Sequence, residues 1–584
     1  MDELKWVVLP QKQSDIPVDL SDPGKCPIQG AFYLDTRTAA GIRKLLVYIP
    51  ESWNNNDPVL VIAPPSDRTA EEFLLESGLC AFTRKHKVMA ALLVRDAQAS
   101  MDEEAIFMNA AYKKLQAREY FVAMQDCFYA MGFGDGSSVA MKAMLSMGSD
   151  WSGAAFFGNI KDVTSEAVVA DADQGNQSGE LYISGEKAQL PVWLLEEASS
   201  PELLRVRDYW IRENHDQQEP LFDERGTAVY RPAPLSRTSS INDAPVAEVR
   251  MTLGFRMEQL SCDMLDYVWR FVGAARRHRS YRNKILRYYR DPAREENGAQ
   301  YHQLCVDGMM REWYEYVPER FRQSEKPLPL VVAFHGRGGN GQSFFDITDL
   351  SLVAEERGFI ALFPTADIYQ IRPDGYRGVR LWNGNYDGKE LDSMPFVRAM
   401  IEDTAMRHPV DRSRIYACGQ SSGGYMTVCC AFQADDLFAA VAPWSGYTFP
   451  GSQGLKLPGD FCGHLNQVPI YLLVGKKDGI FGAPSIDLSA PSNDLERFLL
   501  YVLDAYGLPK DYDSYECYPI QYYVWKKNGV PLLTLGLVDD MPHANYAEES
   551  RISYDDFMCR FSKDSMGNRY YMGKKVCNGS DTKV

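Results

Sequence analysis

The chain has 584 residues, more than one ordinary hydrophobic core accommodates, so we expect at least two domains. Hydrophobic residues make up 45% of it and charged residues 24%, as in other soluble globular proteins. The net charge of −17 argues against a nucleic-acid-binding protein, which needs a basic face, so no nucleic-acid partner is expected.

The N-terminal sequence MDELKWVVLPQKQSD has no basic start followed by an apolar stretch, so we expect no signal peptide. No run of 18 apolar residues occurs, so no membrane partner is expected either. The 12 cysteines lack CxxC pairs, which argues against structural zinc, and we expect neither a metal nor a cofactor. Reduced thiols and a cytoplasmic location fit these features best.

Five segments of the chain occur twice, in the same order. The pairs are LLVYIPESW with WYEYVPERF, VLVIAPPSDRTAEEF with LVVAFHGRGGNGQSF, YAMGFGDGSSVA with YACGQSSGGYMT, PVWLLEE with VPIYLLVG, and MTLGF with LTLGL. Five ordered matches are hard to explain by chance, so they indicate an internal duplication.

The first copy extends from about residue 28 to 275 and the second from about 300 to 565. RDPAREENGAQ (290–300), rich in charges and containing Pro and Gly, reads as the linker, which gives domains 1–290 and 291–584. The basic run 276–294 precedes this linker and predicts a connector helix paired with acidic neighbours. An anion- or nucleic-acid-binding helix is the alternative.

Short apolar runs in the second copy predict buried parallel strands at 330–334, 359–363, 414–418, 439–443 and 470–474. Helical patterns lie between them, at 394–407 and 425–434. Strands that alternate with helices indicate an α/β fold, with a mostly parallel sheet and helices on both faces in each copy.

The sequence Gly419-Gln-Ser421-Ser-Gly423 fits G-x-S-x-G and lies between the strand RIYAC and a helix expected to begin near Gly424. A serine in this context occupies a sharp, strained strand-to-helix turn that lifts its hydroxyl above the sheet. Ser421 is therefore the predicted nucleophile.

A serine hydroxyl needs a base, usually a histidine held by a carboxylate. Only His464 and His543 follow the serine, and His464 precedes the strand VPIYLLVG, so it would come before the acid. In the chain order Ser, acid, His, the base is His543 and the acid is Asp478, which ends the loop GKKD after that strand. Asp539 and Asp540 are alternatives, but they lie too close in sequence to the histidine.

The glycine-rich loop HGRGG (335–339) follows the first central strand and predicts one side of an oxyanion hole. Its donor is the N–H of Arg337, with Gly338 as second choice, and the other donor is the N–H of Ser422. The loop also fits the dinucleotide fingerprint G-x-G-x-x-G, but His335 before it and the serine turn after it favour a hydrolase.

The stretches DSMPFVRAMIEDTAMRHPVDRSRIYACGQSSGGYM and LFAAVAPWSG resemble the polyhydroxybutyrate depolymerase-like esterases, a branch of the α/β-hydrolases that includes feruloyl and acetylxylan esterases. The resemblance covers about residues 300–560. It implies two tandem α/β-hydrolase-like domains and a carboxylic ester hydrolase that acts through an acyl-enzyme. Ser421 would be the nucleophile, Asp478 the acid and His543 the base. The extra copy and the missing signal favour a small soluble ester over a polymer.

Two tryptophans, Trp382 in RLWNG and Trp444 in APWSG, fall near the expected top of the sheet. They would line a substrate pocket together with His335, or else belong to the core.

The first copy lacks the corresponding chemistry. Gly134 stands where Ser421 stands, and PPSDR (64–68), whose prolines have no N–H to donate, stands opposite HGRGG. No histidine directly follows MTLGF, where Ser261 lies instead, and the segment after PVWLL offers Glu196 or Glu197 in place of the aspartate. We expect this degenerate domain to pack against the second copy and contribute to its cleft, or to mediate homo-oligomerisation.

The sequence thus predicts a serine carboxylic ester hydrolase for a small ester, aromatic or hydroxyacyl, with one half degenerate. Two alternatives stay open. One is a serine peptidase or amidase with the same triad, and the other is a non-catalytic binding protein.

Overall fold

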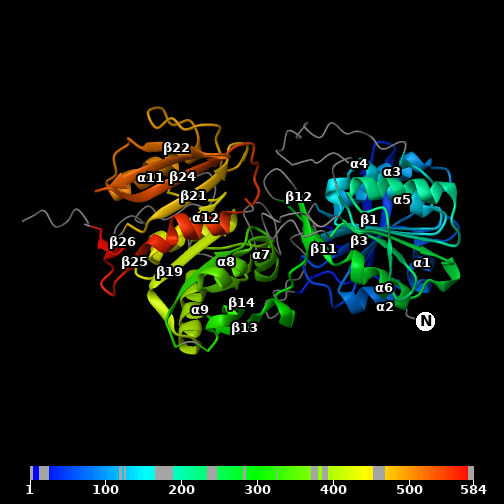
Figure 1. Ribbon diagram of the computed structural model, residues 1–584, viewed down its shortest axis with the longest axis horizontal. Coiled ribbons are helices and arrows are strands. Elements are labelled where there is room, and N and C mark those ends of the chain that lie inside the picture. The colour runs from blue at the N-terminus through cyan, green and yellow to red at the C-terminus, as the bar shows by residue number, and fades with distance from the viewer. Residues whose placement is uncertain are drawn as a thin grey trace, which may run out of the picture.

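The protein forms two lobes, each built around a ten-stranded sheet (Figure 1). The computed structural model describes residues 4–11, 25–116, 121–123, 127–164, 189–232, 246–279, 284–323, 325–369, 379–384, 392–450, 467–546 and 548–576.

The first sheet has the strand order β1-β2-β4-β3-β5-β6-β7-β10-β9-β8. Its strands are β1 Gly30–Thr38, β2 Gly41–Ile49, β3 Val59–Ala63, β4 Met89–Leu93, β5 Phe128–Phe133, β6 Gly153–Phe157, β7 Val192–Glu196, β8 Leu221–Phe222, β9 Ala228–Tyr230 and β10 Val249–Leu253.

The second sheet has the order β13-β14-β16-β15-β19-β20-β21-β24-β23-β22. Its strands are β13 Ala299–Val306, β14 Met309–Tyr316, β15 Leu328–Phe334, β16 Ile360–Pro364, β19 Val410–Gln420, β20 Ala440–Trp444, β21 Ile470–Gly475, β22 Asp513–Cys517, β23 Ile520–Lys527 and β24 Val530–Val538.

The two sheets have the same topology, strand for strand. In each, a parallel centre is flanked by antiparallel strands at both edges, and every adjacent pair runs in the corresponding direction. The repeated segments of the sequence fall on equivalent strands, for example β5 and β19 or β10 and β24. The predicted fold class, two tandem copies of an α/β fold with a mostly parallel sheet, is therefore confirmed.

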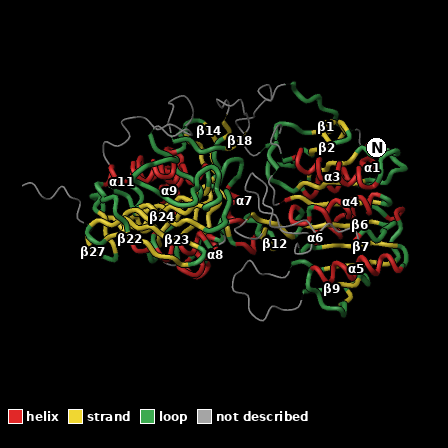
Figure 2. The backbone as a smooth tube through the Cα atoms, turned by 90° about the horizontal axis from the view of Figure 1, so that it is seen from above, coloured by secondary structure: helices red, strands yellow, loops and turns green. Residues whose placement is uncertain are grey.

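Helices cover both faces of the first sheet (Figure 1), and Figure 2 shows the same lobe from above, with α3, α4 and α5 running alongside its strands. The apolar side chains of α3, α4 and α5 belong to the core on one face, and those of α1, α2 and α6 to the core on the other. A serine, one of the residues preferred at helix N-caps, begins α3: the Ser100 side chain accepts a hydrogen bond from the N–H of Glu103. The bounds are α1 Ala70–Glu76, α2 Leu79–His86, α3 Met101–Leu115, α4 Gly136–Ser146, α5 Pro201–Glu213 and α6 Cys262–Val272.

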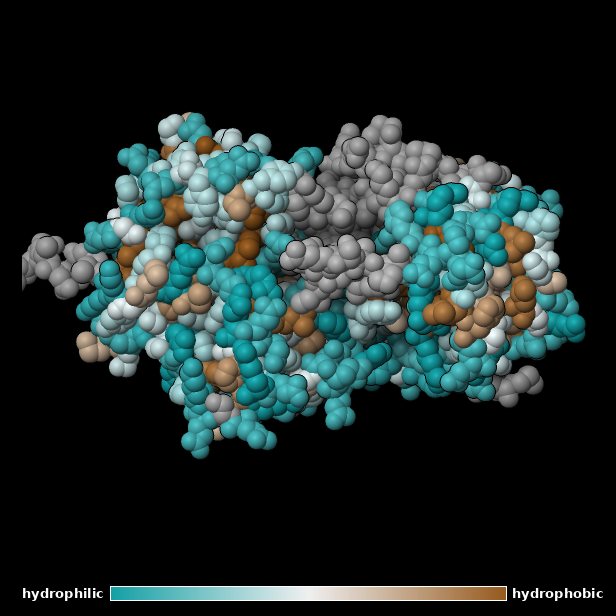
Figure 3. Space-filling view, viewed as in Figure 1, coloured by the Kyte–Doolittle hydropathy of each residue, from teal (hydrophilic) through white to brown (hydrophobic). Residues whose placement is uncertain are grey.

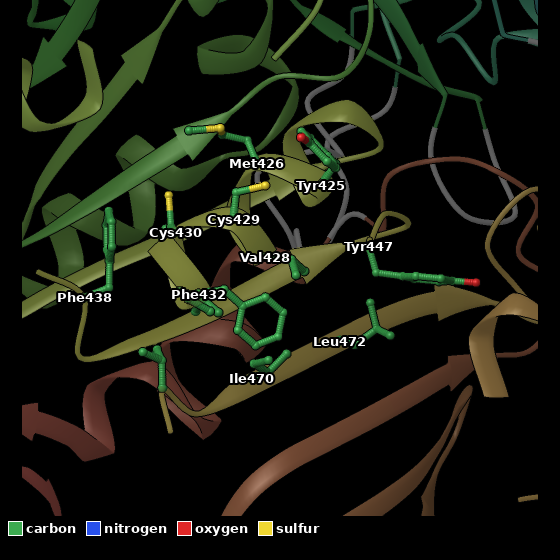
Figure 4. Close-up of a cluster of buried hydrophobic side chains, with 14 of the residues drawn as sticks. Tyr425, Met426, Val428, Cys429, Cys430, Phe432, Phe438, Tyr447, Ile470 and Leu472 are labelled. Atoms are coloured by element: carbon green, nitrogen blue, oxygen red, sulfur yellow. The ribbon is translucent and has the colours of Figure 1, made fainter. Parts of the chain in front are cut away.

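The second sheet is covered in the same way. Along β15, Leu330 and Val332 belong to the core under α9, α10 and α11, and Val331 and Ala333 to the core under α7, α8 and α12. Burial of both faces explains why the central strands read as continuous apolar runs. Figure 4 shows part of the first of these cores, with the sulfur atoms of Cys429 and Cys430 among its apolar side chains. The bounds are α7 Gly341–Ile347, α8 Leu350–Arg357, α9 Met394–Arg407, α10 Ser422–Gln433, α11 Asp494–Tyr506 and α12 Glu549–Asp556.

The predicted connector helix in the basic run is wrong, because the run forms an antiparallel hairpin of β11, Ala275–Arg279, and β12, Lys284–Tyr288. The hairpin lies between the lobes (Figure 1), where it pairs with acidic residues as expected. The Arg287 guanidinium contacts the carboxylate of Asp349, and that of Arg290 lies 3.2 Å from the same carboxylate. Asp349 belongs to the second half, so the hairpin and the residues after it link the two lobes.

Smaller strands complete the second lobe. They are the pair β17 Ile368–Tyr369 and β18 Val379–Arg380, and the three-stranded sheet of β25 Phe561–Lys563, β26 Arg569–Tyr571 and β27 Lys574–Lys575.

The face of the molecule in Figure 3 is mainly hydrophilic, with hydrophobic residues in small separate groups. In the part of the chain that the structure describes, no helix combines the length and the apolar character that crossing a membrane requires. Within the same residues, no group of three or more His, Cys, Asp or Glu side chains is arranged to hold a metal ion.

Candidate active site

Ser421 lies at the turn between β19 and α10, as the G-x-S-x-G pattern predicts. Its backbone is in an unusual conformation for a non-glycine residue, with φ 56° and ψ −115°. Its N–H donates to the carbonyl of Trp444 at 2.9 Å. A Cβ on Gly423 would lie 1.9 Å from the carbonyl oxygen of Phe334, so only glycine lets α10 approach β15 this closely.

The structure brings together the three residues proposed as a triad. His543 Nε2 lies 3.0 Å from Ser421 Oγ, and His543 Nδ1 lies 2.9 Å from Asp478 Oδ2. A carboxylate accepts hydrogen bonds, so Nδ1 carries the proton and Nε2 presents its lone pair to the serine hydroxyl. This is the tautomer that a general base for the serine requires.

The environment of Asp478 suits an acid that orients a histidine. Its side chain is fully buried, and its other oxygen, Oδ1, accepts from the N–H groups of Ile480 at 2.9 Å and Phe481 at 3.1 Å. The Phe481 ring also packs against the His543 imidazole, with centroids 5.6 Å apart. Three hydrogen bonds therefore fix the carboxylate, while the histidine side chain remains 27% exposed.

The alternative acids are engaged elsewhere. Asp539 forms an ion pair with Lys476 at 2.5 Å and Asp540 one with Lys477 at 2.9 Å. The alternative base, His464, lies outside the described residues.

The loop 335–340 follows β15 and lies beside the serine turn, as expected for an oxyanion loop. A Cβ built on Gly336 would lie 3.6 Å from the Cβ of Ser421. The N–H of Gly338, the second-choice donor, is already donated to the Arg380 carbonyl at 2.9 Å, so Arg337 is the better candidate from this loop. Ser422, the other predicted donor, is the first residue of α10, where N–H groups have no partner within the helix.

His335 is buried within the second half rather than displayed at its surface. Its Nδ1 lies 2.6 Å from the Gly336 carbonyl, and its Nε2 accepts from the N–H of Ala366 at 2.9 Å. Burial lowers the pKa of this imidazole to about 3, so it is neutral at physiological pH. It shapes the loop and is not a second proton carrier.

Both tryptophans proposed for the pocket are fully buried. Trp382 lies beside the oxyanion loop, because its Nε1 donates to the His335 carbonyl at 2.9 Å and its N–H to Ser422 Oγ at 3.2 Å. Trp444 ends β20, and its Nε1 donates to Ser553 Oγ at 2.9 Å, within the core. The first therefore supports the site, and the second supports the serine turn from the core.

The first half repeats the turn without the serine. Gly134 has φ 57°, and its N–H donates to the Phe157 carbonyl at 2.8 Å, as that of Ser421 does to Trp444. A Cβ on Gly134 would lie 3.4 Å from the Cβ of Pro65. Ser261 is the N-cap of α6, accepting from Met264.

One contact to the site comes from the other half of the chain and has no signal in the sequence. The side-chain amide of Asn56 donates to the carbonyl of Gly338 in the oxyanion loop at 2.8 Å.

Comparison with known proteins finds similarity in the C-terminal half. Residues 316–455 match the model of the family described as "Esterase PHB depolymerase", so this segment of the C-terminal half is similar to that family. The segment includes the serine turn, whereas Asp478 and His543 lie beyond it.

Two curated relatives match this half. "Feruloyl esterase B" of Thermothelomyces thermophilus is 34% identical over 148 residues, which is 24% of this chain and 46% of the relative. "Probable acetylxylan esterase A" of Neosartorya fischeri is 29% identical over 134 residues, which is 23% of this chain and 34% of the relative. The chain thus spans less than half the length of the curated relatives it matches. A solved acetyl xylan esterase from Aspergillus awamori aligns with a TM-score of 0.31 at 17% identity, covering 44% of this chain and 98% of that one.

Proposed function

We propose that the protein is a serine carboxylic ester hydrolase whose C-terminal half performs the reaction through an acyl-enzyme. The observation that carries the proposal is the continuous hydrogen-bonded line from Asp478 through His543 to Ser421 Oγ. The named relatives, a feruloyl and an acetylxylan esterase, support the ester as substrate class.

In the acylation step, Ser421 Oγ attacks the carbonyl carbon of the ester while His543 Nε2 takes its proton. The carbonyl oxygen becomes an oxyanion, which the N–H groups of Ser422 and Arg337 stabilise. The C–O bond to the alcohol then breaks, and the imidazolium returns the proton to the leaving oxygen.

Deacylation repeats these steps with water. His543 takes a proton from a water molecule as its oxygen attacks the acyl carbon, and the second tetrahedral intermediate collapses to release the acid. The proton returns to Ser421 Oγ, so the net reaction consumes one ester and one water and yields one acid and one alcohol. Asp478 keeps the imidazole oriented and stabilises its charged form throughout.

The first half has no part in the bond-making steps. Gly134 replaces the nucleophile, Ser261 caps a helix, and prolines stand where loop donors are needed. We propose that this half is catalytically degenerate and that the substrate is a small ester with an acetyl, aromatic or hydroxyacyl group.

Hydrolysis of a p-nitrophenyl ester panel against matched p-nitroanilides tests the reaction class. We expect turnover of esters with a rapid first release of one nitrophenolate per protein, and Ser421→Ala should abolish both. A preference for the anilides would contradict the ester assignment, and unchanged turnover in Ser421→Ala would contradict the nucleophile.

A further inference from the structure

A hydrogen bond from the first half reaches the oxyanion loop of the second half. Asn56, in the loop between β2 and β3, donates its Nδ2–H to the carbonyl oxygen of Gly338 at 2.8 Å. We propose that Asn56 is a positioning residue for the oxyanion hole, so that the degenerate half completes the site of its sibling. The inference rests on the proposed function of the second half.

Within its own half, the loop is held by backbone hydrogen bonds at Gly338 and Gly339. The N–H of Gly338 donates to the Arg380 carbonyl at 2.9 Å, and the N–H of Gly339 to the Gly336 carbonyl at 3.0 Å. The Asn56 amide adds a hydrogen bond to the carbonyl of Gly338, so both the N–H and the carbonyl of Gly338 are hydrogen-bonded. Arg337, the candidate donor, precedes it directly, and its orientation depends on where Gly338 lies.

The Asn56 side chain is itself held in place. Its backbone has φ 76°, a region that Asn tolerates better than most residues, and its N–H donates to the Val122 carbonyl at 2.9 Å. The N–H of Val122 in turn donates to Asn55 Oδ1 at 2.9 Å. Because a carbonyl only accepts, the nitrogen of the Asn56 amide must face Gly338. Its Oδ1 is buried and, among the described residues, has no hydrogen-bond partner.

The helix that follows the oxyanion loop, α7, is also bonded to the first half. The loop leads directly into α7, where Gln342 Nε2 donates to Tyr289 Oη at 2.7 Å. The Arg287 guanidinium, which is buried, contacts the carbonyl of Asp346 at the other end of α7 and the carboxylate of Asp349 beyond it. The first half therefore holds the oxyanion loop through Asn56, and it holds α7 through the β11–β12 hairpin and the residue that follows it.

This arrangement gives the first half a role that needs no chemistry of its own. An oxyanion hole stabilises the transition state only if its donors are already in place, and a misplacement of about 1 Å can cost about 100-fold in rate. Loss of the Asn56 bond leaves the Arg337 donor present but less well placed. We therefore expect a loss of roughly 10- to 100-fold in kcat, with little change in KM.

The test uses the full chain with two variants at Asn56. Asn56→Gly removes the amide and tolerates the positive φ, whereas Asn56→Asp keeps the shape and replaces the donor by an oxygen that repels the carbonyl. Asn159→Gly is the matched control, because Asn159 is an exposed asparagine of the same half with φ 51°. All rates are expressed per folded molecule, with the folded fraction taken from thermal unfolding.

The readouts are the rate constant for fluorophosphonate labelling and the kcat and KM for a p-nitrophenyl ester. Both Asn56 variants should lose labelling rate and kcat about 10- to 100-fold, with KM within about twofold of the parent, and Asn159→Gly should match the parent. Parent-like rates per folded molecule in both Asn56 variants, or a loss confined to KM, would overturn the inference. Absence of labelling in the parent would instead refute the proposed function.

Discussion

Replacement of Asp478 by asparagine tests how the triad is oriented. The carboxylate uses Oδ1 to accept two backbone N–H groups and Oδ2 to face His543 Nδ1. In Asp478→Asn the amide oxygen must remain with the two N–H donors, so the NH₂ group turns toward the imidazole. Because that group donates, Nδ1 must become the acceptor, and the imidazole proton moves to Nε2, opposite the serine hydroxyl.

The expected loss is large because the base is then blocked. A triad with the wrong tautomer loses about 10⁴-fold in kcat, which corresponds to about 5.4 kcal/mol at about 1.36 kcal/mol per factor of ten. We expect a fall of 10³- to 10⁴-fold in steady-state hydrolysis of a p-nitrophenyl ester by Asp478→Asn, with an unchanged thermal midpoint. Asp540→Asn, which removes the carboxylate that pairs with Lys477, should stay near the parent. A loss of less than tenfold in Asp478→Asn would refute the assignment of this acid.

Three further predictions concern the first half and the pH dependence of stability. In a Ser421→Ala background, Gly134→Ser should restore no fluorophosphonate labelling, and labelling at residue 134 would contradict the degeneracy of the first half. Burial alone would raise the pKa of Glu315, but hydrogen bonds from two histidines and an arginine outweigh it and hold this pKa well below its usual value. The ionised Glu315 carboxylate therefore stabilises the folded protein above about pH 4.5, and this stabilisation is lost as the pH falls. Glu315→Gln should destabilise the protein at pH 7 by about 3 kcal/mol. Its thermal midpoint should also fall less steeply than that of the parent as the pH is lowered below about 4.5. An equally steep fall in the variant would contradict this. Burial raises the pKa of Glu549 to about 8, so the stability of the parent should fall as the pH rises from about 4.5 to 8. The thermal midpoint of Glu549→Gln should fall less over the same pH range. Equal slopes for parent and variant would contradict this prediction.

Much of the fold was predictable because both faces of each sheet are buried. The expected strand 330–334 lies within β15, Leu328–Phe334, and the expected helix 394–407 coincides with α9. The duplication helped further, because equivalent strands occur in the same order in both sheets. The three residues of the candidate triad could be predicted for another reason, because only two histidines follow Ser421.

The junction between the halves was not predictable in the same way. The basic run was expected to form a helix, but it forms a hairpin in which Arg287 contacts Asp346 and Asp349 of the other half. The bond from Asn56 to Gly338 joins residues 282 positions apart in sequence. Local periodicity carries no information about such contacts, because they depend on how two separately folded surfaces meet.

The assignment of Ser421 as the nucleophile can be tested by intact-mass analysis with peptide mapping after incubation of the protein with a fluorophosphonate. We expect one adduct per chain, located on Ser421 and absent from Ser421→Ala. An adduct that persists in Ser421→Ala, or that maps to another residue, would contradict it.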